Sequence, residues 1–105
     1  MIKLSIIIPV YNEIKTIEKL INKIFKLKIK KQVIVVDDGS SDGTEILLKK
    51  YKKKIDELLI HKRNLGKGAA IKSAQKFVKG KYVAIQDADL EYDPKDLLRI
   101  VSEME

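Results

Sequence analysis

Two aspartates that follow a predicted strand, Asp87 and Asp89, are the side chains of this protein best suited to chemistry. The apolar run Tyr82–Ile85 before them is typical of a buried strand. Because alternate residues of a strand face the same side, both carboxylates are expected to point the same way where the strand ends. Carboxylate oxygens suit Mg²⁺ or Mn²⁺, which usually keeps water and phosphate ligands as well. We therefore predict a divalent-metal site at Asp87 and Asp89, with Glu91 as a third ligand.

The alternative is an acidic loop that only caps the next helix. Asp93 suits that role, as an N-cap followed by Pro94 at the first helical position. Asp87 and Asp89 lie earlier, at the carboxyl end of a strand, which is where ligands bind in open α/β sheets. The metal site is therefore the favoured interpretation for this pair.

A second acidic pair, Asp37 and Asp38, follows the apolar run Val33–Val36. Acids after the second parallel strand contact the nucleoside in dinucleotide-binding folds. The same acids can instead hold the turn at residues 39–41 by local hydrogen bonds. Both are candidate nucleotide contacts. We expect one to bind the ligand and the other to hold the turn, with Asp38 preferred as the ligand.

Cationic and aromatic candidates lie in two other loops. Arg63 and Lys67 flank a glycine loop that leads into a predicted helix, and such a loop can hold phosphate. The loop matches neither the dinucleotide fingerprint nor the GxxxxGK[ST] phosphate-binding loop. Tyr11 could stack on a base or be a half-buried aromatic at a strand end. His61 has no evident nucleophile to pair with, so we expect a surface residue without a role.

Four predicted strands must position these side chains. The apolar runs alternate with helical patterns, which favours an α/β fold with a Rossmann-like, three-layer parallel sheet of about four strands. The carboxyl ends of parallel strands lie on one edge, so the polar groups should converge on one crevice. The expected strands are Leu4–Val10, Val33–Val36, Leu58–His61 and Tyr82–Ile85.

The predicted helices each carry an end signal. Asn12 is the expected N-cap of the first helix, and Asp42 with Glu45 has the spacing of a capping box for the second. The third is expected from about Ala69 to Val78, with Gly80 as its C-cap. Asp93 begins the fourth.

Composition restricts the class of protein. The chain has 105 residues, 45% of them hydrophobic, and no cysteine, so we expect one globular domain over residues 1–105 without disulfides or thiolate metal sites. The net charge of +7 is mostly lysine, concentrated in residues 26–31 and 49–54. Lysine runs without interleaved aromatics favour solvated helix faces, so no nucleic-acid partner is expected. An anionic membrane surface remains an alternative.

The N-terminal apolar run, Leu4–Val10, is too short for a signal peptide or a membrane span. It is interrupted by Ser5 and Pro9 and followed by polar residues. A cytoplasmic location is therefore the expectation.

Taken together, four segments resemble the N-terminal half of a family 2 glycosyltransferase with the GT-A fold. The resemblance is strongest to the polyprenol-phosphate (dolichol-phosphate) mannosyl- and glucosyltransferases. The segments occur in family order and spacing and span nearly the whole chain. They are SIIIPVYNE (residues 5–13), VIVVDDGSSDGT (33–44), RNLGKGAA (63–70) and IQDADLEYDP (85–94).

The resemblance implies a role for each candidate residue. Asp87 and Asp89 would be the catalytic DxD pair that holds the metal on the donor diphosphate, and the metal role of Glu91 is less regular in the family. Asp38 would contact the base, and Arg63 or Lys67 would lie near the diphosphate. The remaining nucleotide-pocket residues would be Pro9, Tyr11, Glu13, Asp37 and Gln86.

The resemblance also implies a reaction. A hexose would pass, with inversion, from a UDP- or GDP-sugar to an acceptor such as a polyprenyl phosphate at the membrane surface, with Mg²⁺ or Mn²⁺. In the family the acceptor-binding half follows this segment. We therefore expect either a fragment or a chain whose open sheet edge is covered by self-association or a partner.

Three alternatives compete with this interpretation. A nucleotidyltransferase usually has a glycine-rich signature after the first strand, where residues 9–13 here read PVYNE. A receiver domain should have its acid pair after the first strand, whereas Asp37 and Asp38 follow the second. A non-catalytic nucleotide-sugar-binding or interaction module is the serious alternative.

Overall fold

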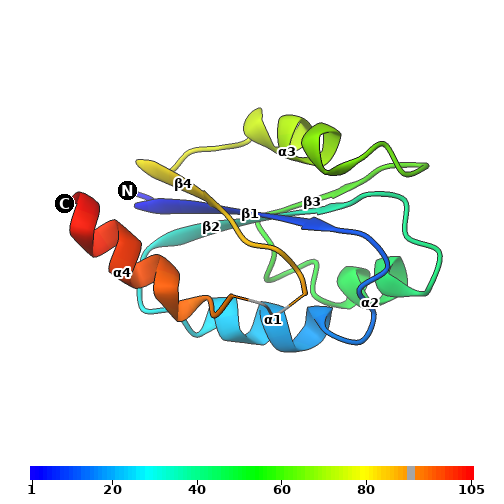
Figure 1. The fold of residues 1–105 in the computed structure, drawn as a ribbon, viewed down its shortest axis with the longest axis horizontal. Coiled ribbons are helices and arrows are strands. Elements are labelled where there is room, and N and C mark those ends of the chain that lie inside the picture. Colours follow the sequence, from blue (N-terminus) through cyan, green and yellow to red (C-terminus); the bar gives the residue numbers. More distant parts are fainter. Residues whose placement is uncertain (90–91) are drawn as a thin grey trace.

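A four-stranded parallel sheet forms the centre of the protein, in a computed structural model that describes residues 1–89 and 92–105. The strand order is β3-β2-β1-β4, and helices cover both faces (Figure 1). The predicted α/β, three-layer parallel fold is therefore confirmed. In chain order the elements are β1 (Leu4–Val10), α1 (Ile17–Phe25), β2 (Lys31–Asp37), α2 (Thr44–Lys50), β3 (Glu57–Ile60), α3 (Lys67–Gln75), β4 (Tyr82–Ile85) and α4 (Lys95–Met104).

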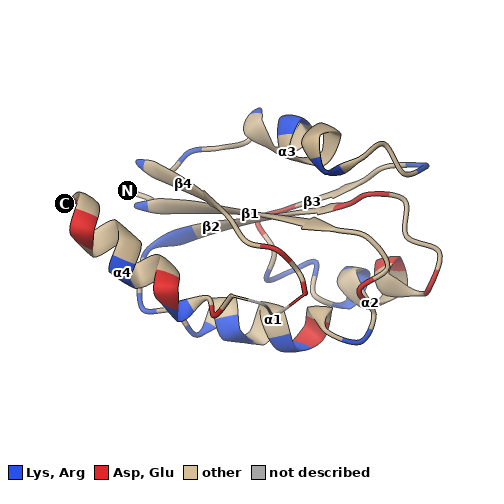
Figure 2. Cartoon of the chain, in the orientation of Figure 1, with Lys and Arg blue, Asp and Glu red and all other residues tan. Residues whose placement is uncertain are grey.

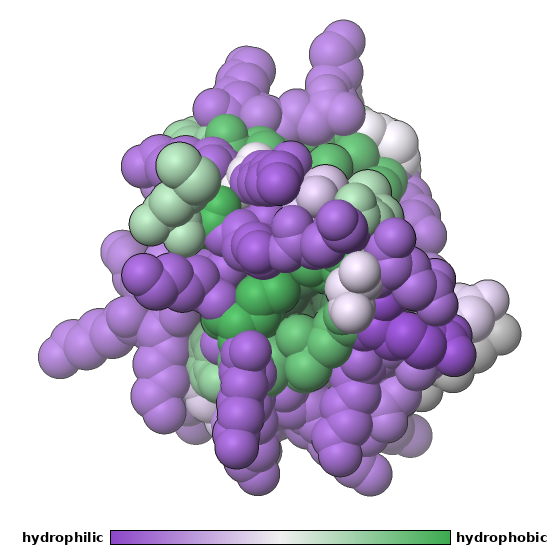
Figure 3. Space-filling model, turned by 90° about the vertical axis from the view of Figure 1, so that its left-hand side faces the viewer, coloured by the Kyte–Doolittle hydropathy of each residue, from purple (hydrophilic) through white to green (hydrophobic). Residues whose placement is uncertain are grey.

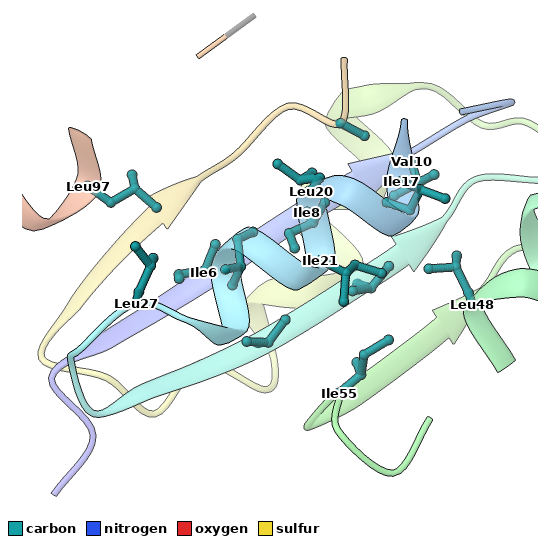
Figure 4. Close-up of a cluster of buried hydrophobic side chains, with 14 of the residues drawn as sticks. Ile6, Ile8, Val10, Ile17, Leu20, Ile21, Leu27, Leu48, Ile55 and Leu97 are labelled. Carbon is teal, nitrogen blue, oxygen red and sulfur yellow. The ribbon is translucent and has the colours of Figure 1, made fainter. Parts of the chain in front are cut away.

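The larger core lies between the sheet and the layer that contains α1, α2 and α4 (Figure 1). Alternate residues of β1 point into it, and α1 supplies apolar residues at helical spacing. Figure 4 shows these side chains meeting between helix and sheet. The buried members from these two elements are Leu4, Ile6, Ile8, Val10, Ile17, Leu20, Ile21 and Ile24.

A smaller core lies on the other face, where α3 packs on β1 and β2. The small side chains of Ala70 and Ala74 are fully buried and let α3 approach the sheet closely. Because β1 is buried on both faces, its sequence is almost continuously apolar, as expected for a parallel strand.

The edge strand β4 is left partly uncovered on the α3 side. Its Val83 and Ile85 pair in register with Ser5 and Ile7 of β1. Ile7 belongs to the core beneath α3, so Val83 and Ile85 face that side as well. They remain 55% and 47% exposed.

The segment between α3 and β4 is held by a buried polar cluster. The Ser5 hydroxyl donates to Gln32 Oε1 over 2.6 Å, and the backbone N–H of Gly80 donates to Ser5 Oγ over 2.8 Å. The prediction that Gly80 caps α3 is wrong, because α3 ends at Gln75. Gly80 is glycine because a Cβ there would lie 2.6 Å from the backbone nitrogen of Ser5.

The predicted helix starts need correction. α1 begins at Ile17, not after Asn12, which has a positive φ of 50°. The predicted capping box is only half formed. Asp42 accepts the backbone N–H of Thr44, the first residue of α2, over 3.0 Å, but Glu45 pairs with Lys49.

The start of α4 is displaced by one residue. The helix begins at Lys95, with Pro94 at its N-cap. Asp93 still accepts the backbone N–H of Lys95 over 2.9 Å, so it satisfies a free donor of the first turn as the sequence indicated.

Across the described residues, no helix combines the length and the apolar character needed to cross a bilayer. Apolar atoms are nevertheless visible on the surface. Figure 3 views the end at which both termini lie and shows hydrophobic patches framed by hydrophilic side chains. Large exposed apolar side chains include Ile100 and Met104 of α4.

Candidate functional site

A cleft of about 520 Å³ lies at the carboxyl ends of the strands. The loops after β1, β2, β3 and β4 all contribute to it, as the parallel topology requires. Acidic side chains and one lysine share this cleft. Its lining residues are Pro9, Val10, Tyr11, Glu13, Asp38, Asn64, Gly66, Lys67, Ala70, Asp87, Ala88 and Asp89.

The Asp38 carboxylate holds one wall of the cleft. It is 3% exposed and accepts the backbone N–H groups of Leu65 over 2.9 Å and Gly66 over 2.8 Å. Asn64 Nδ2 donates to Oδ2 over 3.1 Å, and His61 Nδ1 lies 2.8 Å from Oδ1. An ionised carboxylate only accepts hydrogen bonds, so Nδ1 of His61 carries the shared proton.

These contacts change the titration of Asp38. Burial alone would raise the pKa of its carboxyl. The hydrogen bonds from His61 and from the backbone of Leu65 and Gly66 outweigh burial and hold the pKa below its usual value. The ionised carboxylate is therefore the form that the fold stabilises.

We expect the stability supplied by Asp38 to be lost in acid. A folded-state pKa below the unfolded value stabilises the fold fully above about pH 4, where an unfolded aspartate is ionised. As pH falls through the folded pKa, that contribution disappears. Urea unfolding at several pH values from 7 to 3 measures the slope of the free energy of unfolding against pH. The slope should be shallower in Asp38→Asn, and equal slopes would contradict the assignment.

Gly39 lets the loop after β2 touch the loop after β3. Its φ is +76°, and a Cβ there would lie 2.4 Å from the backbone carbon of Arg63. Only glycine fits both this backbone conformation and this contact. The close approach brings the Asp38 carboxylate within reach of the N–H groups of residues 65 and 66.

Hydrogen bonds also tie the loop after β1 to the loop after β2. Asn12 donates its N–H to Ser40 Oγ over 2.9 Å, and its Oδ1 accepts the N–H of Ser41 over 2.8 Å. The backbone N–H of Glu13 donates to Thr44 Oγ1 over 3.2 Å. These bonds explain the left-handed conformation of Asn12, and they fix where Glu13 enters the cleft.

Thr16 connects Glu13 with the aspartate pair. Its hydroxyl lies 2.7 Å from the backbone oxygen of Ala88 and 3.0 Å from Glu13 Oε2. Ala88 lies between Asp87 and Asp89, so this hydroxyl helps to hold the loop after β4 against the loop after β1.

Asp37 is fully buried at the end of β2. Its Oδ1 accepts the backbone N–H of Ser40 over 3.2 Å and also the Ser40 hydroxyl. These are the local turn bonds that the sequence allowed. Among the described residues, Oδ2 of Asp37 is a buried side-chain oxygen without a hydrogen-bond partner. Asp37 does not line the cleft, and its predicted nucleotide contact stays a prediction.

Lys67 and Asp87 form an ion pair across the cleft. Lys67 is the first residue of α3, so its ammonium lies where the positive end of the helix dipole also points. The Lys67 ammonium thus balances part of the negative charge that the carboxylates bring into the cleft.

The aspartate pair fits a divalent metal by its donor set. Asp87 and Asp89 both line the cleft and offer only hard oxygen ligands. The described residues contain no group of three or more His, Cys, Asp or Glu side chains that could hold a metal. The fit is therefore to an ion such as Mg²⁺, which takes few carboxylates and completes its shell with water and phosphate. Glu91, the predicted third ligand, lies outside the described residues.

Of the predicted site residues, the structure brings seven into the cleft: Pro9, Tyr11, Glu13, Asp38, Lys67, Asp87 and Asp89. Three others, Asp37, Arg63 and Gln86, lie outside its lining. Arg63 is exposed. Gln86 is 3% exposed and donates from Nε2 to the backbone oxygen of Tyr92 over 3.1 Å, so it supports the loop after β4.

His61 is the residue that sequence reasoning missed. Its side chain is not a free surface group, because it joins Asp38 to Ser73 of α3, whose Oγ lies 2.9 Å from Nε2. The available signal was its position: His61 follows β3, at the same sheet edge as the acids. Asn64, a further lining residue, also went unassigned.

Residues 5–105 match the family described as Glycosyl transferase family 2. The match covers nearly the whole chain, and the chain belongs to this family. The resemblance carried by the four sequence segments is thereby confirmed.

A curated relative is the dodecaprenyl-phosphate galacturonate synthase of Rhizobium johnstonii. It is 32% identical over 114 residues, which cover 99% of this chain and 33% of the relative. The homologues include such polyprenyl-phosphate sugar transferases, and this chain spans about a third of that relative's length.

Solved structures of GT-A glycosyltransferases share the fold. A fragment of S. aureus TarS in complex with UDP-GlcNAc matches with a TM-score of 0.82 and 30% identity, over 96% of this chain and 30% of that one. A mannosyltransferase from Pyrobaculum calidifontis in complex with GDP-Man and Mn²⁺ matches with a TM-score of 0.77 and 30% identity, over 83% of this chain and 27% of that one.

Proposed function

We propose that this chain forms the donor-binding part of a metal-dependent, inverting glycosyltransferase. It would bind a UDP- or GDP-sugar, and the hexose would pass to a polyprenyl phosphate at the cytoplasmic face of a membrane. The observation that carries the proposal is the cleft, which gathers the acidic strand ends and Lys67 in one place. The nucleotide sugars bound by the two structural neighbours and the polyprenyl-phosphate relative support it.

Each side of the cleft has a role in this proposal. Pro9 and Tyr11 line the nucleoside end, and Glu13 accepts a ribose hydroxyl. Asp38 fixes the loop that closes the nucleoside pocket. Four donors already occupy the acceptor sites of its two oxygens, so a direct contact with the base stays a prediction.

The other end of the cleft receives the diphosphate. Asp87 and Asp89 would hold Mg²⁺ or Mn²⁺, which supplies neutralisation of the charge that develops on the leaving diphosphate. Lys67, now paired with Asp87, is placed to turn its ammonium to a diphosphate oxygen. The N-terminus of α3 adds a favourable field for the same anion.

The acceptor determines how much proton transfer the reaction needs. A phosphate oxygen of a polyprenyl phosphate is already anionic, so it can attack the anomeric carbon without a general base. The bond from that carbon to the diphosphate oxygen breaks as the new bond forms on the opposite face, which inverts the configuration. The nucleoside diphosphate leaves.

Nucleotide binding is the direct test. UDP or GDP at 100 times its Kd should stabilise the fold by about 2.7 kcal/mol, and the stabilisation should require Mg²⁺ or Mn²⁺. Thermal and urea unfolding, with and without the ion, measure the stabilisation by the nucleotide and its dependence on the metal. The proposal fails if UDP, GDP and their sugars all leave the unfolding transition unchanged.

Transfer of labelled sugar to a polyprenyl phosphate then separates an enzyme from a module that only binds the donor. Nucleotide binding without transfer by the protein would identify the binding module.

A further inference from the structure

The segment that contains α3 carries a net charge equal to that of the whole chain. Residues 61–81 contain seven lysine and arginine residues and no aspartate or glutamate. The rest of the chain is electrically balanced, because the whole has a net charge of +7. Figure 2 shows the layer that contains α3 with blue segments and no red.

Most of these cations are free to meet a partner. Within the described residues, only Lys67 and Lys81 of this segment make an ion pair. Lys72 of α3 and Lys76 at its C-cap are one turn apart and exposed. They lie on the side of the helix opposite Ala70 and Ala74, which are buried against the sheet. Lys79, just past the helix, is exposed as well.

Apolar side chains are exposed on the same side of the molecule. Val83 and Ile85 of β4 face the α3 side and are about half exposed. Leu65, in the loop that leads into α3, is 51% exposed. Cations beside exposed aliphatic groups suit the interface of an anionic bilayer, where the charges meet lipid phosphates and the aliphatic groups enter the headgroup region.

We propose that the α3 face, defined as the exposed cations of residues 62–79 with Val83 and Ile85, docks on an anionic phospholipid membrane. This deepens the proposed function and rests on it for the choice of a lipid acceptor. Nucleic acid is the less suitable partner. The cations are nearly all lysine, and the one aromatic side chain of the segment, Phe77, is partly buried against the core rather than free to stack on bases.

Docking through this face would place the donor cleft beside the membrane. Lys67 and Ala70 belong to α3 and also line the cleft. One helix therefore borders both the lipid-facing surface and the diphosphate end of the site. A lipid phosphate would reach the cleft by a short path along α3.

The test is co-sedimentation of the protein with vesicles of phosphatidylcholine and phosphatidylglycerol in equal parts, free of polyprenyl phosphate and nucleotide. Each lysine near such a surface contributes about fivefold, so Lys72→Gln/Lys76→Gln/Lys79→Gln should lower the partition coefficient roughly 100-fold. Val83→Thr/Ile85→Thr, which keeps β-branched residues in the strand, should lower it several-fold. Neither the wild type nor the variants should bind vesicles of pure phosphatidylcholine.

A charge-matched control uses the opposite layer. Lys50 ends α2, and Lys52 and Lys53 follow it. All three are exposed, and none makes an ion pair among the described residues. Lys50→Gln/Lys52→Gln/Lys53→Gln removes the same charge and should leave vesicle binding within about twofold of wild type, because it changes only the distant part of the field.

The inference is wrong if the wild type does not bind the anionic vesicles, or if both lysine triples lower vesicle binding equally. It is also wrong if the protein binds the single-stranded RNA polyuridylate as tightly as the vesicles and Val83→Thr/Ile85→Thr does not change vesicle binding. The nucleotide-dependent melting shift is measured on the same variants. If it persists while vesicle binding fails, the docking surface is wrong and the donor-binding function stands.

Discussion

Replacing Asp87 and Asp89 together by asparagine is expected to abolish metal-dependent binding of the nucleotide. Both side chains line the cleft, and neutral amides are poor ligands for Mg²⁺ or Mn²⁺. The stabilisation of about 2.7 kcal/mol expected at 100 times the Kd should disappear. Sugar transfer by the protein should fall at least about 100-fold, since charge on the leaving diphosphate is no longer neutralised. Unfolding with ligand and a transfer assay measure the two effects.

The fold of this variant should be intact without ligand. The Lys67–Asp87 pair is partly exposed, and such pairs contribute at most about 1 kcal/mol. Asp96→Asn/Glu103→Gln is the matched control, because it removes two exposed carboxylates from α4, away from the cleft. A metal-dependent shift that persists in Asp87→Asn/Asp89→Asn would show that the metal binds elsewhere.

Asp38→Asn is expected to have the largest effect on stability among single substitutions in the cleft. The carboxylate accepts two backbone N–H groups and the His61 ring. An amide replaces one acceptor oxygen by a donor that faces other donors, so roughly two charge-assisted hydrogen bonds are lost. At about 1.5 kcal/mol or more each, the free energy of unfolding should fall by about 3 kcal/mol. Urea unfolding at pH 7 measures it.

The matched control makes the same change, aspartate to asparagine, at a carboxylate that accepts a single backbone hydrogen bond. Asp56 accepts the backbone N–H of Val33 over 2.6 Å, outside the cleft. Asp56→Asn should cost about 1 kcal/mol, and it should leave nucleotide binding unchanged. Equal losses in the two variants would mean that the Asp38 network contributes no more than a single hydrogen bond.

Much of the site follows from the order of strands along the chain. The four apolar runs predict parallel strands, because each is followed by a helical pattern. Polar residues after Val10, Val36 and Ile85 must then share one sheet edge. This inference needs only the two-residue repeat of a strand and the handedness of crossovers, so Asp38, Asp87 and Asp89 could be placed together without coordinates.

Contacts between loops could not be predicted in this way. Asn12 looks like an N-cap by residue type, but its bonds to Ser40 and Ser41 hold it in a left-handed conformation and delay α1 to Ile17. Gly80 looks like a C-cap, but it serves a close approach to Ser5. In both cases a tertiary contact outweighs a local preference of about 1 kcal/mol.

The role of His61 separates what the sequence could determine from what required the tertiary structure. The sequence by itself determined the parallel sheet, the edge at which its acids gather and the family. Only the tertiary structure decided that the Asp38 carboxylate accepts hydrogen bonds from His61, from the Asn64 side chain and from the backbone of residues 65 and 66. The physical reason is range: strand and helix patterns repeat within a few residues, whereas the partners of Asp38 lie more than twenty residues away and meet it only because Gly39 lets the two loops touch.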